Sequence, residues 1–202
     1  MKPPESDHQL FERLRAGQEQ AFLALYQKRQ PALYRFALQM SGSASVAEDI
    51  TQDVFMALVR DECGYDPSRG SLAAYLFGIA RKLLLRQYER RRSDVPVDTG
   101  GGEAGFAELV DDADPLADLT TRERVEALRR AVASLPRRYR EVVVLCDLEE
   151  VDYAEAAVAL GCPIGTVRSR LHRARSMLAV KLRDERHGGA SVPAWKAARC
   201  AI

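Results

Sequence analysis

Apolar positions recur at helical spacing near the C-terminal end of the chain. Five residues fall at intervals of four, three, four and four: Val167, Leu171, Ala174, Leu178 and Leu182. This spacing places them on one inward-facing stripe of an amphipathic helix. Four arginines lie outside that stripe: Arg168, Arg170, Arg173 and Arg175. A helix that is anchored by one face and carries guanidinium groups on the others is suited to the DNA major groove.

The residues just before this helix predict a shorter helix and a tight turn. Asp152 is suited to an N-cap, and Glu155, three residues later, completes a capping box. Gly161 stands where a helix ends in a left-handed residue, and Pro163 suits the first turn of the next helix. Cap, glycine, proline and stripe come in the order that a helix-turn-helix requires. The alternative is a solvated basic helix in an ordinary helical bundle.

The first half of the chain also has helical periodicity. A short opening helix is expected around residues 10–14, and a second from 21 to 29, where Pro31 interrupts the pattern. A further apolar stripe over residues 33–40 ends at Gly42. These patterns predict several short helices in the first half of the chain.

Two longer helices are expected next. Ser45 and Glu48 form a second capping box, which opens a helix that runs to about residue 60. Residues 66–70 have the composition of a turn, and Ser71 is suited to cap a long helix to about residue 91.

The middle of the chain has no periodicity. Residues 94–115 contain three consecutive glycines and many acids, which predicts a flexible linker. Two helices and the helix-turn-helix are expected within residues 116–186, and residues 187–202 are interpreted as a poorly ordered tail. Because no strand of useful length is visible, the predicted fold is all-α. Two small helical domains, residues 1–93 and 116–186, are joined by an acidic flexible linker, and the second contains the helix-turn-helix.

Charge is segregated along the chain, although the net charge over 202 residues is only +1. Residues 81–92 hold six basic side chains against one acid, and residues 94–123 hold nine acids against one arginine. Basic residues dominate again from 164 to 186. Local patches bind phosphates and the average charge does not, so two basic surfaces remain candidates for nucleic acid.

Several classes of function are disfavoured by what the sequence lacks. No apolar run is long enough to span a bilayer and the N-terminus lacks a signal region, so a cytoplasmic location is expected. The four cysteines are scattered and are interpreted as reduced thiols; the alternative is a zinc or redox site of Cys146, Cys162 and His172 formed through folding. No phosphate-binding glycine loop, HExxH motif or nucleophile elbow is present. We expect no enzymatic activity, no catalytic residue, no cofactor and no bound metal.

The long helix after Ser71 combines aromatic rings with cations. Its rings include Tyr75, Phe77 and Tyr88, and its cations are Arg81, Lys82, Arg86, Arg90, Arg91 and Arg92. Interleaved cations and planar rings hold backbone phosphates while unpaired bases stack. The alternative for Tyr75 and Phe77 is packing in the core. The cations are harder to explain structurally, because a cluster of like charges repels itself unless it meets an anion.

The helix before it has the opposite character. Its polar side carries Glu48, Asp49, Gln52 and Asp53. Such a face is usually only solvated. The functional interpretation is a docking surface for a basic partner.

Taken together, these segments resemble the extracytoplasmic-function (group IV) sigma factors of bacterial RNA polymerase. In the first domain the resemblance rests on AFLALYQKRQPALYRFAL, AEDITQDVFMALVR and YDPSRGSLAAYLFGIARKLLLRQYERRR, which begin at residues 21, 47 and 65. In the second it rests on LPRRYREVVVLCDLEEVDYAEAAVALGCPIGTVRSRLHRARSML, which begins at residue 135. The resemblance implies a subunit that binds core RNA polymerase and directs promoter-specific transcription initiation in a stress or envelope response.

The resemblance also implies which residues meet each partner. The first domain would dock on the clamp of the polymerase's largest subunit through Glu48, Asp49, Gln52, Asp53 and Phe55. It would bind the minus-ten element as a single strand through Tyr75, Arg81, Lys82, Arg86 and Arg90. The second domain would read the minus-thirty-five element in duplex DNA through Thr166, Arg168, Ser169, Arg170 and Arg173. Many relatives carry Trp at the position of Tyr75, which is a departure from the family pattern.

An anti-sigma protein is a further partner that the resemblance implies. A second interpretation of the chain is a stand-alone DNA-binding regulator that uses the same helix-turn-helix. Such a regulator needs neither the acidic docking face nor a helix of cations and rings for single strands. An independent enzyme is the third interpretation, and no motif supports it.

Overall fold

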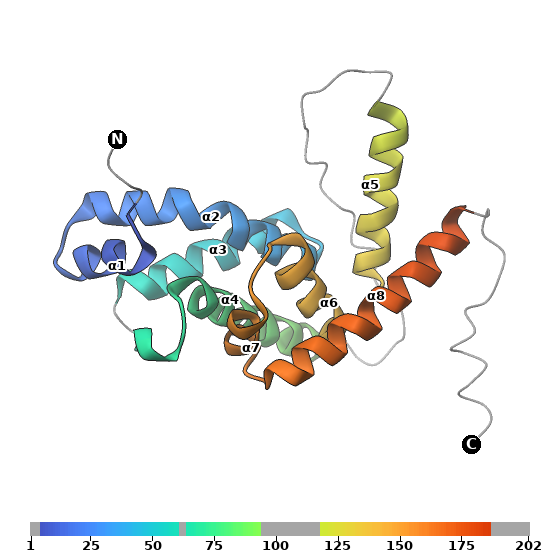
Figure 1. Cartoon of the computed structure of the whole chain (residues 1–202). Coiled ribbons are helices and arrows are strands. Elements are labelled where there is room, and N and C mark those ends of the chain that lie inside the picture. The colour runs from blue at the N-terminus through green and yellow to red at the C-terminus, as the bar shows by residue number, and fades with distance from the viewer. Residues whose placement is uncertain (1–4, 61–63, 94–117, 187–202) are drawn as a thin grey trace.

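The computed structural model describes residues 5–60, 64–93 and 118–186 (Figure 1). Within these residues the regular elements are helices, which confirms the all-α prediction. The predicted linker, 94–115, and the predicted tail, 187–202, lie outside the described residues, and the exact domain boundaries stay predictions. No helix of the described part is long and apolar enough to cross a membrane.

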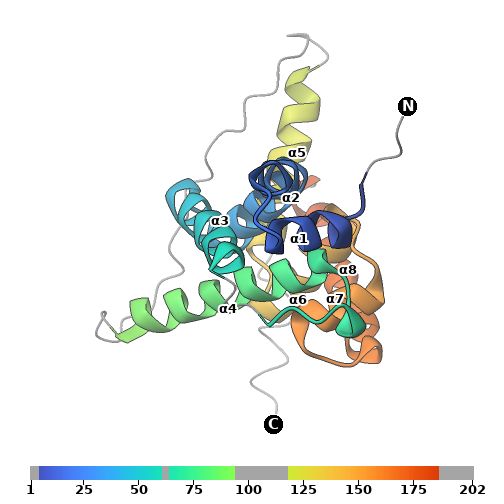
Figure 2. The same ribbon diagram turned by 90° about the vertical axis from the view of Figure 1, so that its left-hand side faces the viewer.

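The first half of the chain is a bundle in which α2 is the central helix. It packs against α1, α3 and α4 (Figure 2). Its elements are α1 (Asp7–Arg15), α2 (Glu19–Ser41), α3 (Ala44–Val59), the 3-10 turn η1 (Pro67–Arg69) and α4 (Leu72–Ser93). Buried apolar side chains from all four α-helices meet in the core, with Phe36 of α2 5.4 Å from Phe77 of α4 between ring centroids. Phe77 therefore has the core role.

The prediction that Pro31 interrupts a helix is wrong. Helix α2 runs through it without a break from residue 19 to residue 41. Pro31 lies on the exposed side, as does Gln27, whose carbonyl loses its usual N–H partner and can be hydrated. Leu25 and Leu33, on either side of the proline, are buried in the same core. Tertiary packing on that face outweighs the local cost of the proline.

The helix caps agree with the sequence at Ser71 and differ at Ser45. The Ser71 hydroxyl accepts a hydrogen bond from the Ala74 N–H (3.2 Å), which starts α4 as predicted. Helix α3 begins two residues earlier than predicted, because Ser43 is its N-cap and its hydroxyl accepts a hydrogen bond from the Val46 N–H. Ser45 instead lies inside the first turn and is exposed.

The second half of the chain contains the predicted helix-turn-helix. Its elements are α5 (Asp118–Ala133), α6 (Arg137–Val143), the π-helical turn η2 (Val144–Leu148), α7 (Tyr153–Leu160) and α8 (Ile164–Arg186). Asp152 caps α7, although its carboxylate accepts from the second helical residue, Ala154, rather than the third. Gly161 has φ +60°, the left-handed conformation that the turn between α7 and α8 requires.

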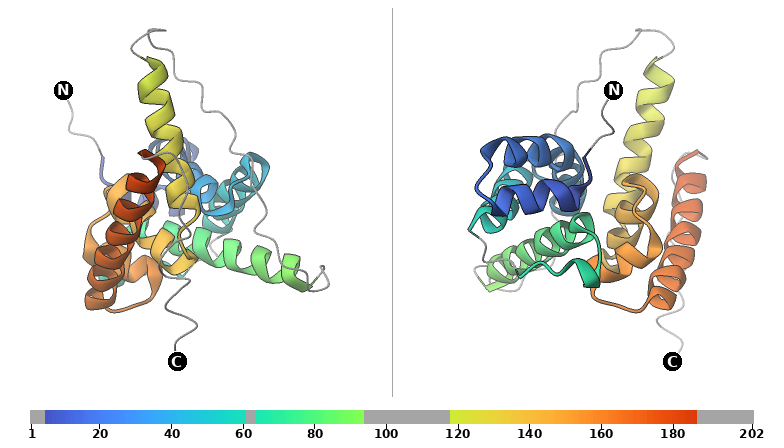
Figure 3. Two further views of the ribbon diagram at one scale, coloured as in Figure 1. Left: turned by 90° about the vertical axis from the view of Figure 1, so that its right-hand side faces the viewer. Right: turned by 60° about the vertical axis from the view of Figure 1, so that its left-hand side comes forward.

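The predicted stripe of α8 faces inward. Val167, Leu171, Ala174 and Leu178 are buried, and Leu182 packs partly buried against the same core. One continuous apolar cluster joins this half to the first, because α4 packs along α7 and α2 touches α5 and α6 (Figure 3). The two halves therefore form a closed arrangement.

Candidate nucleic-acid interface

Three of the predicted single-strand-binding cations share one exposed side of α4. Lys82, Arg86 and Arg90 are spaced four residues apart, which aligns them along the helix, and all three are exposed. The first two line a groove of about 450 Å³ between α3 and α4. Its other lining residues are Asp53, Met56, Ala57, Arg60, Tyr75, Ile79 and Leu83. Cations and an aromatic edge therefore meet in one concave surface.

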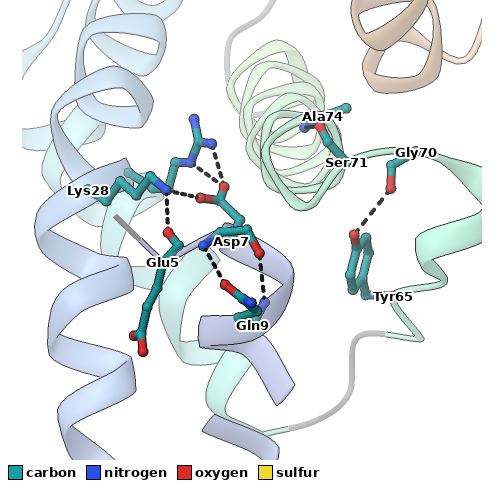
Figure 4. A network of polar contacts seen from close by, with 10 residues as sticks. Glu5, Asp7, Gln9, Lys28, Tyr65, Gly70, Ser71 and Ala74 are labelled. Carbon is teal, nitrogen blue, oxygen red and sulfur yellow. Dashed lines mark hydrogen bonds and ion pairs between the residues drawn. The ribbon is translucent and has the colours of Figure 1, made fainter. Parts of the chain in front are cut away.

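Tyr75 lies between the two roles proposed from its sequence position. It is half-buried, and its ring centroid is 5.4 Å from that of Tyr65, whose ring meets Phe11 edge-on at 5.1 Å. The Tyr65 hydroxyl donates to the Gly70 carbonyl (3.2 Å), so the turn before α4 is held against this stack (Figure 4). Burial, followed by the charge of Asp7, raises the pKa of Tyr65 and keeps this donor protonated. The stack fixes one side of Tyr75, and its other side borders the groove.

The start of α1 holds this aromatic stack in place. The Asp7 carboxylate forms ion pairs with Lys28 (2.8 Å) and with Arg29, which tie the start of α1 to α2 (Figure 4). Phe11, one turn further along α1, is buried beneath Tyr65. The aromatic stack therefore rests on a fixed helix.

Arg81 does not join the other cations of α4. It is half-buried, and its Nε lies 3.2 Å from Oε2 of Glu141 on α6. In this conformation Arg81 faces the second half of the chain, and its role in single-strand binding stays a prediction. The sequence analysis expects the cationic cluster to meet an anion. For Arg81, this anion is the Glu141 carboxylate of the same chain.

The polar side of α3 is as exposed as predicted, and Phe55 is not part of it. Glu48, Asp49, Gln52 and Asp53 are all exposed. Phe55 is only 2% exposed, because its ring packs 4.7 Å from that of Tyr26. Phe55 therefore lies beneath the exposed side and lines the neighbouring groove, and its part in docking stays a prediction.

A groove beside this polar side joins Glu48, Gln52 and Phe55 of the predicted docking set to residues that the docking prediction did not include. Helices α2 and α3 line it with Phe22, Tyr26, Gln30, Tyr34, Glu48, Thr51, Gln52, Phe55 and Met56. The structure identifies this groove by its exposed apolar side chains, since Tyr26 and Met56 are 37% and 41% exposed. Acids bordering an aromatic groove suit a partner that offers both basic and apolar side chains.

The predicted duplex-reading residues share the N-terminal half of α8. Arg168, Ser169 and Arg173 are exposed, and Thr166 and Arg170 are half-buried. The Ser169 hydroxyl donates to the Thr166 carbonyl (3.1 Å). A hydrogen bond from Arg173 lowers the pKa of Tyr139 on α6, while burial acts in the opposite direction. Their roles in DNA recognition stay predictions.

Arg175 is held by a different partner from the other arginines of α8. Its Nε and Nη2 lie 3.1 and 2.6 Å from the two carboxylate oxygens of Asp147, a bidentate pair that raises the pKa of Arg175 further. This pair ties α8 to the π-helical turn. Cys146 precedes Asp147, and no group of three metal-ligating side chains lies together in the described part of the chain.

Two family models match the chain, one in each half. The chain matches the family described as "Sigma-70 region 2" over residues 25–93 and the family "Sigma-70, region 4" over residues 125–178. It is 36% identical to the ECF RNA polymerase sigma factor SigE of Mycolicibacterium smegmatis over 154 residues, which cover 72% of this chain and 55% of that protein. It is 34% identical to the ECF RNA polymerase sigma factor EcfG of Rhodopseudomonas palustris over 152 residues, which cover 75% and 80%.

A solved structure has the same fold. The sigma factor RpoE from Bartonella quintana, co-crystallised with the anti-sigma factor NepR, superposes with a TM-score of 0.59 at 26% identity. The match covers 78% of this chain and 94% of that one. The chain therefore belongs to the extracytoplasmic-function sigma factors of the sigma-70 family.

Proposed function

We propose that this chain binds core RNA polymerase and directs it to a promoter, with no catalysis of its own. The first half docks on the polymerase and holds the opened minus-ten element, and the second half reads the minus-thirty-five element in duplex DNA. The observation that carries the proposal is the presence of two separate cationic surfaces on one chain. One lines the groove between α3 and α4, and the other lies on the second helix of the helix-turn-helix.

The two surfaces suit two states of DNA. The line of Lys82, Arg86 and Arg90 beside Tyr75 fits a flexible strand, because phosphates follow the cations while a base meets the ring. The rigid α8, with Arg168 and Arg173 exposed, fits the major groove. The acidic side of α3 fits a basic protein surface and disfavours DNA.

Run-off transcription tests this function. Purified chain is added to core polymerase with the DNA that lies upstream of its own reading frame. A transcript that depends on both the chain and the promoter is expected. A stand-alone regulator would bind the DNA and give no such transcript, and absence of both transcript and co-elution with core polymerase would refute the proposal.

Charge variants separate the two surfaces. R170E/R173E should abolish dependence on the minus-thirty-five element and leave co-elution with polymerase intact. D49K/Q52K should weaken co-elution, since like charges would then face a basic partner. The matched control is E12K/Q20K, which makes the same charge change at exposed positions of α1 and α2. Equal losses in all three variants would show that net charge, and not these surfaces, sets the binding.

We also propose an anti-sigma protein as a partner. The exposed aromatic groove of α2 and α3 is a surface that a free sigma factor needs to cover. Co-purification of the full chain with a protein that suppresses the run-off transcript tests this partner.

A further inference from the structure

The second half of the chain, which contains the helix-turn-helix, covers part of α4. Helix α7 packs along α4, and a Cβ added at Gly78 of α4 would lie 3.5 Å from the Ala159 carbonyl oxygen, in van der Waals contact. At the preceding turn, a Cβ on Gly70 would lie 3.1 Å from Cγ1 of Val158. Both glycines of the first half therefore lie directly against α7, and Gly70 is the tighter of the two contacts.

A buried acid marks this interface. Glu141 of α6 is 2% exposed, and its two carboxylate oxygens lie 3.2 Å from Nε of Arg81 and 3.2 Å from Nε of Arg137. Arg81 belongs to α4, and Arg137 is one turn before Glu141 on its own helix. Burial of an unpaired carboxylate is costly, so the closed arrangement depends on these arginines.

A second ion pair joins the halves at another point. Nε and Nη2 of Arg35 on α2 lie 2.9 and 2.6 Å from the carboxylate oxygens of Glu149, which follows the π-helical turn. Burial raises the pKa of Glu149, and Arg35 acts against that shift. Arg140 adds a third link by donating to the Met40 carbonyl at the end of α2 (3.2 Å). Acids of the second half thus meet cations of the first at two places.

We propose that the free chain is held closed by this charge pairing, with Glu141 on Arg81 and Glu149 on Arg35. The closed form must open before α4 can receive a promoter strand. In it, a carboxylate holds Arg81 where a phosphate would otherwise bind, and α7 covers the neighbouring face of α4.

The design of the interface favours reversible opening. When the two halves separate, Glu141 keeps its ion pair with Arg137, four residues earlier, and is hydrated again. The carboxylate therefore has a charged partner in both the closed and the open form. A cavity of about 540 Å³ remains between the halves, lined from α4 by Tyr75 and Lys82 and from α7 by Val158. Side chains that border this open space lack packing partners on one side, so the contact gains less from packing than a filled core does.

Distance measurements by double electron–electron resonance on the full-length free chain test the closed form. Nitroxides are attached through unnatural amino acids at the exposed positions Glu12 on α1 and Ser176 on α8, which leaves the native thiols unlabelled. Wild type should give one dominant, narrow distance. E141Q should raise the ratio of open to closed molecules at least tenfold, because removal of one partner of a buried ion pair is strongly unfavourable. E126Q, which alters an acid paired within α5, should change nothing.

Two further variants guard against an artefact of misfolding. G78L should open the chain by placing a side chain where α7 approaches, while Leu is a better helix former than Gly and keeps α4 intact. E149R should open it by charge repulsion, and R35E/E149R should close it again. A broad distance distribution in wild type, or no response to E141Q and G78L, would overturn the closed form.

The consequence for polymerase rests on the proposed function and has its own readout. If the closed form cannot bind, affinity of G78L for core polymerase should rise by the factor by which its competent fraction rises. Opening without a gain in affinity would overturn the gating step and leave the closed form standing. Absence of any polymerase binding by wild type or variant would count against the proposed function instead.

Discussion

Removal of the cations along α4 should lower the salt dependence of single-strand binding by a predictable amount. The variant is K82Q/R86Q/R90Q, and the three side chains are exposed on one side of the helix. Each phosphate contact on single-stranded DNA contributes about 0.7 to the slope of log affinity against log salt. Loss of three contacts should therefore reduce the slope by about 2. Over a fourfold change in salt, wild-type affinity should fall about 16-fold more than that of the variant.

The assay uses the holoenzyme, the state in which the proposed function places the single strand on α4. Binding of a fluorescent single strand carrying the minus-ten element is measured by anisotropy at several salt concentrations. The control, R15Q/R124Q/R130Q, removes the same charge at exposed cations that do not line the α3–α4 groove. An equal change of slope in the control would mean that overall charge acts, and an unchanged slope in the test variant would refute the assignment of the groove.

Three smaller predictions concern the second half of the chain. G161A should destabilise it by about 1–2 kcal/mol in urea unfolding, because φ is +60° there, whereas G165A, at a helical position with open space, should raise stability by no more than about 1 kcal/mol. L171A should cost about 2–5 kcal/mol in the same assay, since the side chain is 2% exposed, and a smaller loss would mean that α8 repacks. Burial, and next the charge of Asp147, raises the pKa of Cys146 from 9.0 to about 11, so its thiolate fraction at pH 8 is roughly 100-fold below that of an ordinary thiol. Its alkylation by iodoacetamide, followed by peptide mass spectrometry, should be slower by that order, and a rate like that of a free thiol would contradict the buried environment.

Local signals gave the helix ends correctly where the interaction itself is local. Ser71 caps α4 through a bond to a residue three positions away, and Gly161 ends α7 by its own conformation. The predictions at Pro31 and Ser45 were wrong because the local preference of each residue is small compared with the packing energy of α2 and α3. A choice between two serines two residues apart depends on where the helix fits its neighbours, which the local pattern does not contain.

The sequence by itself determined the all-α fold, the inward stripe of α8 and the exposed acidic side of α3, because helical periodicity and capping act over a few residues. Only the tertiary structure decided that Arg81 meets Glu141, sixty positions further along the chain, and that Phe55 lies beneath Tyr26. Only it showed that Tyr75 shares a groove with Lys82 and Arg86. The physical reason is that a charge or a ring can be satisfied by any complementary group that folding brings within a few ångströms, and its position in the chain does not name that group.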